Sequence, residues 1–317
     1  MTQLTQQDVL EHQQVVPWPN LYQVEQDLLL CRSMVAIFED DFLSAQVAMR
    51  GGTVLHKVHL APACRYSEDI DLVAIGDRPK EHLQAAIKRV LRPILGTRYT
   101  SAWALLKLAV RNLASPSEIL RVVYKVPSVS TPGMNLTIEI EANVTERIPH
   151  SPLQSLPFSV PFRDDTLQTQ IVSYDLHEML GTKMRALFQR QKGRDLFDLH
   201  RAITSPSGVA EQKIIDAFLH YMGEERTVVP RAEFEAHLAD CLADPGFRTD
   251  MEPPAAERNF LRSRCGRRRD SHQAAVAATG IARPVRAPDL RASSTASRAF
   301  WHVAASSVRW RRRVPAQ

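Results

Sequence analysis

Two aspartates separated by a single residue are the side chains in this sequence best suited to bind a metal ion. Asp69 and Asp71 open a segment, residues 69–75, that is otherwise apolar and typical of a strand. Side chains two residues apart on a strand point to the same face, about 7 Å apart, so both carboxylates can bind the same ions. Mg²⁺ prefers oxygen ligands, and two such ions stabilise the attacking and leaving oxygens of a phosphoryl transfer. The spacing therefore indicates metal-dependent phosphoryl transfer, although most isolated pairs of this kind are simply solvated.

A glycine-rich turn precedes this pair in the sequence. Gly51, Gly52 and Thr53 are followed at once by a segment with helical character. Backbone N–H groups of such a turn, the N-terminus of the following helix and the Thr53 hydroxyl can together bind a triphosphate. The alternative is a plain C-terminal cap of the preceding helix, which the apolar spacing in residues 22–48 predicts.

A third carboxylate would complete the metal site, and one later strand offers two candidates. Residues 135–142 alternate between polar and apolar side chains, and Glu139 and Glu141 lie on the same face of that predicted strand. The alternative is a strand edge that faces solvent. The residues alone leave both possibilities open.

A second group of charged residues follows much later in the chain. Lys183 and Arg190 are seven residues apart and share a face if their helix is continuous, so both can contact phosphates. Asp195 and Asp198 share a face of the next predicted helix, where one of them can position or deprotonate an attacking hydroxyl. The alternative is a purely structural salt bridge between Arg194 and Asp198.

The apolar periodicity along the chain predicts the elements that carry these residues. We expect helices first in residues 22–48, at about 53–59 and at about 79–94. Besides residues 69–75, strands are expected at about 103–111, 118–125 and 135–142. Helices alone follow, at about 175–189, 194–203, 209–223 and 231–243.

The sequence therefore predicts an α/β (α+β) fold in three parts. Residues 1–165 form a domain with a mixed sheet, residues 166–250 form a helical bundle that completes the active site, and residues 251–317 form an Arg-rich tail. The tail contains 14 Arg, no Lys and four acidic residues, whereas the rest of the chain carries 26 basic and 31 acidic side chains. The tail is either an RNA-binding segment or the translation of a GC-rich gene in a shifted frame, which its composition favours; in both cases we expect disorder.

Other features predict a cytoplasmic protein that does not enter a membrane. The four cysteines lie far apart and form no CxxC pair, which argues against a zinc site or a disulfide framework. No apolar run approaches the roughly 20 residues that span a bilayer, and the first residues do not resemble a secretory signal. His56 and His59 lack a third ligand nearby in the sequence and are expected in the core or on the surface.

The two charged groups resemble the AbiEii/AbiGii toxin family of nucleotidyltransferases. Residues 51–53 (GGT) and 65–72 (RYSEDIDL) are similar to the family patterns GGT-x-L and R-[FY]-S-x-D-[IL]-D-[FL]. Lys183, Arg190 and residues 194–199 (RDLFDL) follow the order of its later pattern, a helical Lys, an Arg and then R-D-x-x-D-[LI]. The resemblance covers about residues 20–250 and excludes the tail.

A strand motif of the family bears on the third carboxylate. Residues 141–146 (EANVTE) are similar to the motif E-[IVA]-N-x-x-E, which favours Glu141 over Glu139 as the third metal ligand. The family often has Lys where this chain has Glu139, and this departure weakens the assignment of the strand.

The resemblance implies a nucleotidyltransferase-type fold and a defined reaction. A Mg²⁺-dependent enzyme would transfer NMP from an NTP to an acceptor hydroxyl and release pyrophosphate. The implied metal ligands are Asp69, Asp71 and Glu141. The implied catalytic residues are Asp69, Asp71, Lys183, Asp195 and Asp198. The implied nucleotide-binding residues are Gly51, Gly52, Thr53, Arg65, Ser67, Lys183 and Arg190.

The resemblance also implies biological partners. Members of the family are toxins of bacterial toxin–antitoxin or phage-defence systems, and the antitoxin commonly has a winged-helix DNA-binding domain. Some members add nucleotides to tRNA ends and others bind GTP, so NTP, a tRNA acceptor and an antitoxin are the expected partners. Two alternatives remain: an inactive, partner-binding remnant with a disrupted C-terminus, and a tail that captures an RNA acceptor.

Overall fold

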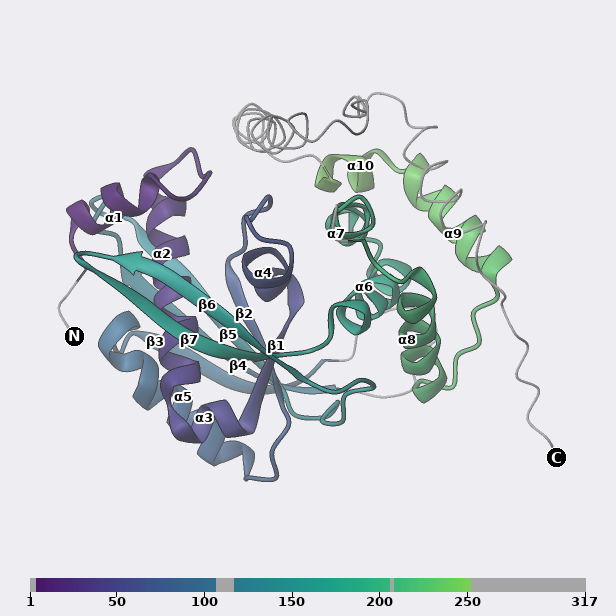
Figure 1. The fold of residues 1–317 in the computed structure, drawn as a ribbon, viewed down its shortest axis with the longest axis horizontal. Coiled ribbons are helices and arrows are strands. Elements are labelled where there is room, and N and C mark those ends of the chain that lie inside the picture. Colours follow the sequence, from purple (N-terminus) through teal and green to yellow (C-terminus); the bar gives the residue numbers. More distant parts are fainter. Residues whose placement is uncertain (1–3, 107–116, 206–207, 252–317) are drawn as a thin grey trace, which may run out of the picture. The chain divides into compact units, whose positions relative to one another are not determined.

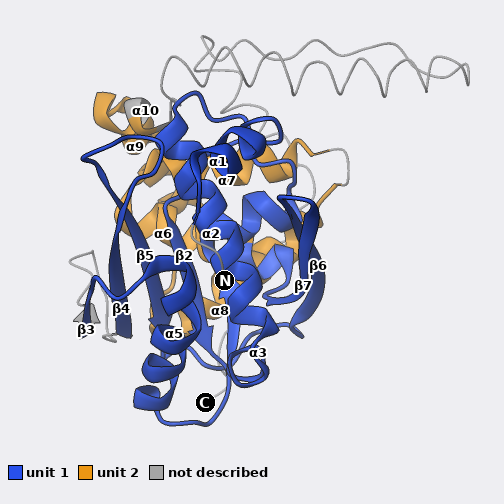
Figure 2. Ribbon diagram, turned by 90° about the vertical axis from the view of Figure 1, so that its left-hand side faces the viewer, with its two compact units in different colours: residues 1–179, 253–260 blue, residues 180–252, 261–317 orange. Residues whose placement is uncertain are grey.

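The computed structural model describes residues 4–106, 117–205 and 208–251, which fall into two compact units (Figures 1 and 2). Unit 1 comprises the described residues up to Met179, and unit 2 those from Leu180 onwards. The boundary lies inside helix α6 (Leu176–Arg190). The predicted division between residues 165 and 166 stays a prediction, and residues 252–317 of the predicted tail lie outside the described residues.

Unit 1 is built on a seven-stranded mixed sheet, which confirms the predicted α/β fold class. The strand order is β3-β4-β5-β2-β1-β7-β6, with β2 parallel to β5 and β1 parallel to β7. The strands are β1 (Val47–Arg50), β2 (Asp69–Ala74), β3 (Tyr99–Leu106), β4 (Ser117–Pro127), β5 (Asn135–Asn143), β6 (Gln154–Phe162) and β7 (Asp165–Ser173). The two parallel pairings bring the short strand β1 and strand β2 to the centre of the sheet.

Helices of unit 1 pack on this sheet and around its central turn (Figure 1). They are α1 (Gln6–Gln13), α2 (Leu21–Glu39), α3 (Asp41–Gln46), α4 (Gly51–Val54), the π-helical turn η1 (Leu55–His59) and α5 (Lys80–Leu95). Helix α2 contacts four strands (β2, β5, β6 and β7) as well as α1 and α5, and it is buried on nearly every side. A helix surrounded in this way has no solvent-facing stripe, which explains why its polar residues, among them Glu25, Asp27 and Arg32, are buried along with its apolar ones.

Strands β2 and β5 are amphipathic, and this decides which side chains face the candidate site. Ile70 and Leu72 of β2 and Ile138 and Ile140 of β5 are fully or almost fully buried. The acidic residues that alternate with them are only half-buried. Since α2 packs on both strands, the apolar side chains lie on the face under α2 and the carboxylates point to the opposite face.

Unit 2 is entirely helical in its described part. Its helices are the remainder of α6, α7 (Gly193–Ile203), α8 (Glu211–Glu224), α9 (Arg231–Ala243) and α10 (Pro245–Met251), which confirms the four predicted helices. Phe234 packs edge-on against Phe218 and stacks on Phe188, with ring centroids 5.5 and 5.9 Å apart. A Cβ atom on Gly181 would lie 2.6 Å from the Cβ of Ala217, so α6 and α8 approach closely only because residue 181 is glycine.

The sequence predicted several elements well and missed others. Helix α5 and strands β4 and β5 match their predicted ranges, while β3 begins earlier than expected, at Tyr99, and residues 107–111 of that prediction lie outside the described part. Strand β1 was hidden at the end of the predicted helical segment 22–48. Strand β6 contains Pro157 and Pro161, which obscure a strand pattern but are tolerated at the sheet edge that β6 occupies. No helix in the described ranges is long and apolar enough to cross a membrane.

Candidate active site

Four charged residues form a row across the centre of the sheet in unit 1. Arg50 of β1 lies opposite Asp71 of β2, Asp71 lies beside Glu141 of β5, and Glu141 lies opposite Arg121 of β4. Residues paired laterally on neighbouring strands point to the same face, so two carboxylates lie between two guanidinium groups. We call Arg50, Asp71, Glu141 and Arg121 the charged row. The structure thus brings together two of the three predicted metal ligands from strands that are distant in sequence.

A second pair of carboxylates lies one step along the same face. Asp69 is paired with Glu139 in the register of β2 and β5, two residues before Asp71 and Glu141. Partial burial raises the pKa of Glu139, and the charges of Glu141 and Asp69 add to this effect, while Arg121 opposes it. Four carboxylates on one half-buried face make a donor set that suits a hard divalent cation.

The predicted metal ligands are near one another but do not form a closed cage. Among the described residues, one group of three His, Cys, Asp or Glu side chains has its ligand atoms within 4.8 Å of one another, and it does not include Asp69, Asp71 or Glu141. Their donor chemistry and shared face fit Mg²⁺, which usually keeps several water and phosphate ligands. Their assignment as metal ligands stays a prediction.

The Gly51–Thr53 turn lies directly against the carboxylate of Asp71. Gly51 has φ +88°, and a Cβ atom there would lie 1.9 Å from Oδ2 of Asp71, so only glycine fits this position. A Cβ atom on Gly52 would lie 2.2 Å from Nη2 of Arg65. Thr53 is buried, and its hydroxyl donates to the backbone oxygen of Asp69 at 2.5 Å. This hydroxyl therefore fixes the turn to β2, and its predicted contact with an anion stays a prediction.

Arg65 and Ser67 lie in the segment that leads into β2. The Arg65 guanidinium approaches Gly52, as described above, and its Nη1 also donates to the backbone oxygen of Tyr66 at 3.3 Å. Ser67 is 7% exposed, and its hydroxyl makes no hydrogen bond to any described residue. The hydroxyls of Tyr124 and Thr169 are buried in the same way, so the nucleotide contact of Ser67 stays a prediction.

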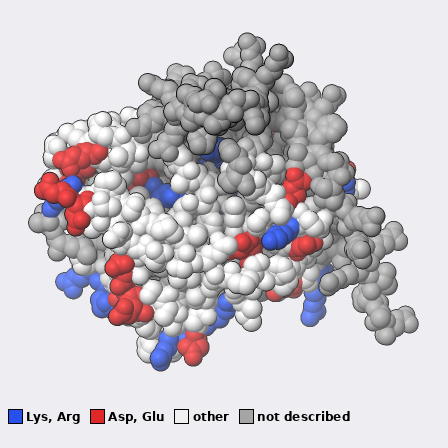
Figure 3. All heavy atoms as spheres, in the orientation of Figure 1, with Lys and Arg blue, Asp and Glu red and all other residues white. Residues whose placement is uncertain are grey.

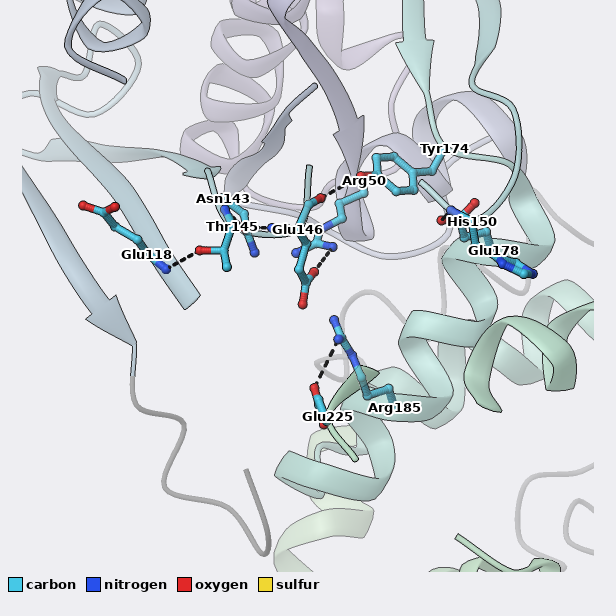
Figure 4. Close-up of polar contacts among 10 residues, drawn as sticks. All are labelled: Arg50, Glu118, Asn143, Thr145, Glu146, His150, Tyr174, Glu178, Arg185 and Glu225. Carbon is cyan, nitrogen blue, oxygen red and sulfur yellow. Dashed lines mark hydrogen bonds and ion pairs between the residues drawn. The ribbon is translucent and has the colours of Figure 1, made fainter. Parts of the chain in front are cut away.

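Arg50 and Glu146 are functional candidates that sequence reasoning missed. Nη1 of Arg50 lies 2.5 Å from Oε2 of Glu146 (Figure 4). Asn143, at the end of β5, accepts hydrogen bonds from the backbone N–H groups of Thr145 and Glu146 at 2.8 and 3.0 Å. The available signals were the position of Arg50 directly before the glycines and the two outer residues, Asn and Glu, of the N-x-x-E motif.

The predicted charged residues of unit 2 also come together. Nζ of Lys183 lies 3.1 Å from Oδ1 of Asp195 and 2.9 Å from Oδ2 of Asp198. Arg190 binds Asp195 through two hydrogen bonds of 2.9 Å each. We call Lys183, Arg190, Asp195 and Asp198 the Lys183 cluster. Asp198 thus forms an ion pair with Lys183, a partner that the sequence did not predict for it.

The Lys183 cluster is buried and electrically balanced. Both aspartate side chains have no solvent exposure, and that of Lys183 is 10% exposed. Burial alone would raise the pKa of Asp195, but the charges and hydrogen bonds of Lys183 and Arg190 outweigh it, so the pKa is lowered. Two cations and two anions therefore fix one another, and Lys183 is held in a defined position.

A third charged group lies in the core of unit 1, and it was not expected. His12, Asp27 and Cys31 are the residues whose ligand atoms lie within 4.8 Å of one another. Lys57, in the turn that follows Gly51–Thr53, places Nζ 2.5 Å from Oδ1 of Asp27, and Nε2 of His12 lies 3.0 Å from Oδ2. Burial raises the pKa of Cys31 to about 12, so it stays a thiol. Lys57 already supplies the positive charge, and the group anchors η1 to α2 and α1.

His56 and His59 both lie on η1, in unit 1. His56 is fully buried, and Nε2 of His59 lies 3.0 Å from Oγ of Ser173. Burial lowers the pKa of His59 to about 4, so its ring is neutral near pH 7. Both residues therefore stabilise the packing of η1, in agreement with the expectation for these two side chains.

The charges on the surface are mixed in sign. On the face drawn in Figure 3, acidic and basic side chains of the described residues alternate and do not gather into one large patch. This distribution gives no electrostatic reason for nonspecific binding of nucleic acid by the visible part of that face.

Comparison with known families decides the class of protein. The model of the family described as "Nucleotidyl transferase AbiEii toxin, Type IV TA system" matches residues 32–277. This chain belongs to the AbiEii family. As an AbiEii protein it is a nucleotidyltransferase toxin of a type IV toxin–antitoxin system, which confirms the predicted family and enzyme class. The family implies an NTP substrate and an antitoxin partner. The matched span contains the Gly51–Thr53 turn, the charged row and the Lys183 cluster, and it continues beyond residue 250, where the expected resemblance ended.

Other comparisons add little to the AbiEii assignment. One solved structure to which the chain is similar is the nucleotidyltransferase toxin MenT4 from Mycobacterium tuberculosis H37Rv, with 16% sequence identity over 81% of this chain and 93% of that chain. Its TM-score is 0.36, so the fold assignment rests on the strands and helices described above. No curated protein matches the chain.

Proposed function

We propose that this AbiEii protein is a Mg²⁺-dependent enzyme that transfers NMP from an NTP to a hydroxyl of tRNA. The observation that carries the proposal is the register of β2 and β5, which sets Asp71 beside Glu141 and next to the Gly51 turn. Asp69, Asp71 and Glu141 are the proposed metal ligands. When bound, Mg²⁺ would neutralise the charge that develops on the phosphate oxygens.

The protein groups around this face have separate tasks in the proposed reaction. The backbone of Gly51 and Gly52, with Thr53, Arg65 and Ser67, binds the nucleotide. The acceptor oxygen forms a bond to the α-phosphorus, the bond from that phosphorus to the β-phosphate oxygen breaks, and pyrophosphate leaves. The acceptor proton passes to a base or to solvent. Catalysis comes mainly from positioning and from charge neutralisation.

The charged residues of unit 2 also have roles in the proposed reaction. Lys183 and Arg190 are proposed to contact nucleotide phosphates. One of Asp195 and Asp198 was predicted to position or deprotonate the acceptor hydroxyl. Their full burial and their contacts with Lys183 support a different role, in which they hold the lysine in place.

The biological setting is proposed from the family resemblance. Addition of nucleotides to tRNA 3′ ends is the acceptor reaction that the resemblance supports, in a cytoplasmic phage-defence system whose antitoxin has a winged-helix domain.

The decisive experiment is a labelling reaction. The purified protein is incubated with total tRNA, Mg²⁺ and each α-³²P-labelled NTP in turn. We expect label on tRNA with at least one NTP, abolition by EDTA, and a loss of about 1,000-fold or more in Asp71→Asn, because a metal ligand of the transition state is removed. Asp77→Asn, an exposed aspartate that follows β2, is the matched control and should keep the wild-type rate.

Two outcomes would contradict the proposal. Unchanged labelling in Asp71→Asn would remove the metal-site assignment. Absence of label with every NTP, from a wild-type protein that unfolds cooperatively, would favour an inactive remnant that only binds its partner.

A further inference from the structure

Arg50 lies at the point where three parts of the candidate site meet. It is the last residue of β1, it directly precedes Gly51, and it is opposite Asp71 in the register of β1 and β2. Its side chain therefore points to the same face of the sheet as the carboxylate of Asp71. A nucleotide bound by the Gly51 turn and by a metal on Asp71 would place its phosphates beside this guanidinium.

The guanidinium of Arg50 is bound by Glu146, which lies in a turn after β5. Asn143 is 4% exposed, and its side-chain oxygen accepts the backbone N–H groups of Thr145 and Glu146. The hydroxyl of Tyr174 donates to the backbone oxygen of Glu146 at 3.4 Å. Figure 4 shows the result: Glu146 turns its carboxylate toward Arg50, and the two form an ion pair across 96 residues of sequence.

The exposure of this pair separates it from the other ion pairs described above. The side chains of Arg50 and Glu146 are each 18% exposed, so the pair is neither sealed in the core nor freely solvated. Arg121, at the other end of the charged row, is 46% exposed and binds the carboxylates of Glu139 and Glu141 themselves. Arg50, in contrast, forms an ion pair with Glu146, which follows β5 and lies outside the acidic residues of β2 and β5.

We propose that Arg50 is a phosphate-binding residue of the nucleotide site and that Glu146 is a positioning residue that orients its guanidinium. This inference rests on the proposed function, because it places the phosphates of an NTP at the Gly51 turn. The planar guanidinium presents five N–H donors, so it can bind Glu146 along one edge and phosphate oxygens along another. It also offsets the repulsion between a triphosphate and the four carboxylates on this face.

The test measures binding of inorganic tripolyphosphate in the presence of Mg²⁺ to the full-length protein, by calorimetry. We expect Arg50→Gln to weaken the Kd by roughly 10- to 100-fold, the size expected for one charge-assisted contact. Arg50→Lys should recover part of this loss, because it keeps the charge but loses the fork. Arg89→Gln is the matched control: Arg89 is an exposed arginine on α5 whose ion pair with Asp40 lies away from the charged row.

Glu146→Gln tests the positioning role. It should weaken tripolyphosphate binding by roughly 3- to 10-fold on its own and have no further effect in the Arg50→Gln background, because it acts through Arg50. In the labelling reaction, Arg50→Gln should raise the KM for NTP more than it lowers kcat. A merely structural pair would instead lower the Tm of both variants and leave the Kd of the folded protein unchanged.

The outcomes distinguish this inference from the proposed function. If the wild-type protein transfers label and Arg50→Gln keeps the wild-type Kd and KM, the inference alone is overturned. Independent, additive effects of Arg50→Gln and Glu146→Gln overturn the positioning role of Glu146. If the wild-type protein binds tripolyphosphate through Arg50 but never transfers label, the proposed function is overturned and the assignment of the phosphate site is kept. Wild-type protein that does not bind tripolyphosphate overturns the inference whatever its activity.

Discussion

The charged row of unit 1 and the Lys183 cluster of unit 2 contain the same kinds of side chain but differ in burial. The carboxylates of the row lie half-buried on an open strand face, between arginines that are 18% and 46% exposed. The two aspartates of the cluster have no exposure, and their partners come from α6, the neighbouring helix. A half-buried row can exchange its partners for a ligand, whereas a buried cluster loses much of its stability when one member is removed.

The largest difference in stability should come from an Asp→Asn substitution made once in the Lys183 cluster and once in the charged row. Asp198→Asn leaves Lys183 with less negative charge in a buried position and should reduce the free energy of unfolding by about 3 kcal/mol. Asp71→Asn lies on the half-buried strand face and should change stability by less than about 1 kcal/mol, even though it abolishes transfer. Urea denaturation of both variants measures this difference.

A control from unit 2 sharpens that experiment. Asp216→Asn removes an exposed aspartate of α8 that accepts a hydrogen bond from Gln212, and it should leave stability nearly unchanged. If Asp198→Asn were as stable as Asp216→Asn, the Lys183 cluster would not be the stabilising element that its burial indicates.

On the acidic face of β2 and β5, the two glutamates of β5 should differ in their effect on activity. Glu141 pairs with Asp71 and Glu139 with Asp69, so both lie on the acidic face. We expect Glu141→Gln to reduce transfer by roughly 100-fold and to raise the Mg²⁺ concentration needed, as for a lost metal ligand. Glu139→Gln should cost less than about 10-fold. If Glu139→Gln lost more activity than Glu141→Gln, Glu139 would be assigned as the metal ligand in place of Glu141.

The smallest effect concerns pH. The pKa of Asp195 is lowered in the folded protein because Lys183 and Arg190 outweigh its burial. A lowered folded pKa gives stability that is complete above the unfolded value, near 3.9, and is lost as pH falls through the folded value. Asp195→Asn should therefore show a shallower loss of stability below about pH 4 than wild type does. Parallel pH curves would show that Asp195 contributes nothing to acid unfolding.

The sequence predicted the acidic face because its signals are local. The alternation of acid and apolar residues in β2 and β5 is visible within six to nine residues, and the structure reproduces it as one half-buried and one buried face. Helical spacing likewise indicated that Lys183 shares a face with Arg190 and Asp195 with Asp198, but it did not indicate that Lys183 contacts the two aspartates. What each residue does in catalysis stays a prediction.

The parts that could not be predicted depend on contacts distant in sequence. Nothing near Arg50 indicates that Glu146 is its partner, since the pair forms only after β1, β2 and β5 have aligned. Nothing in the sequence near Asp27 indicates its pairing with Lys57 and His12, which follows from how α1 and η1 pack on α2. The direct approach of Gly51 to Asp71 also required the register of the two strands.

The order of the strands also affects how the protein acquires its active site during synthesis. The Lys183 cluster joins residues 12 positions apart, whereas Arg50 and Glu146 are 96 positions apart. Glu141 and Glu146 leave the ribosome after Asp71, by roughly 4 to 15 s at ordinary rates of translation. Until β5 inserts between β4 and β2, the nascent chain has the glycine turn, Arg50, Asp71 and Arg121 but lacks Glu141 of the row. A nascent toxin of this fold therefore stays without its complete charged row until nearly half of the chain has been made.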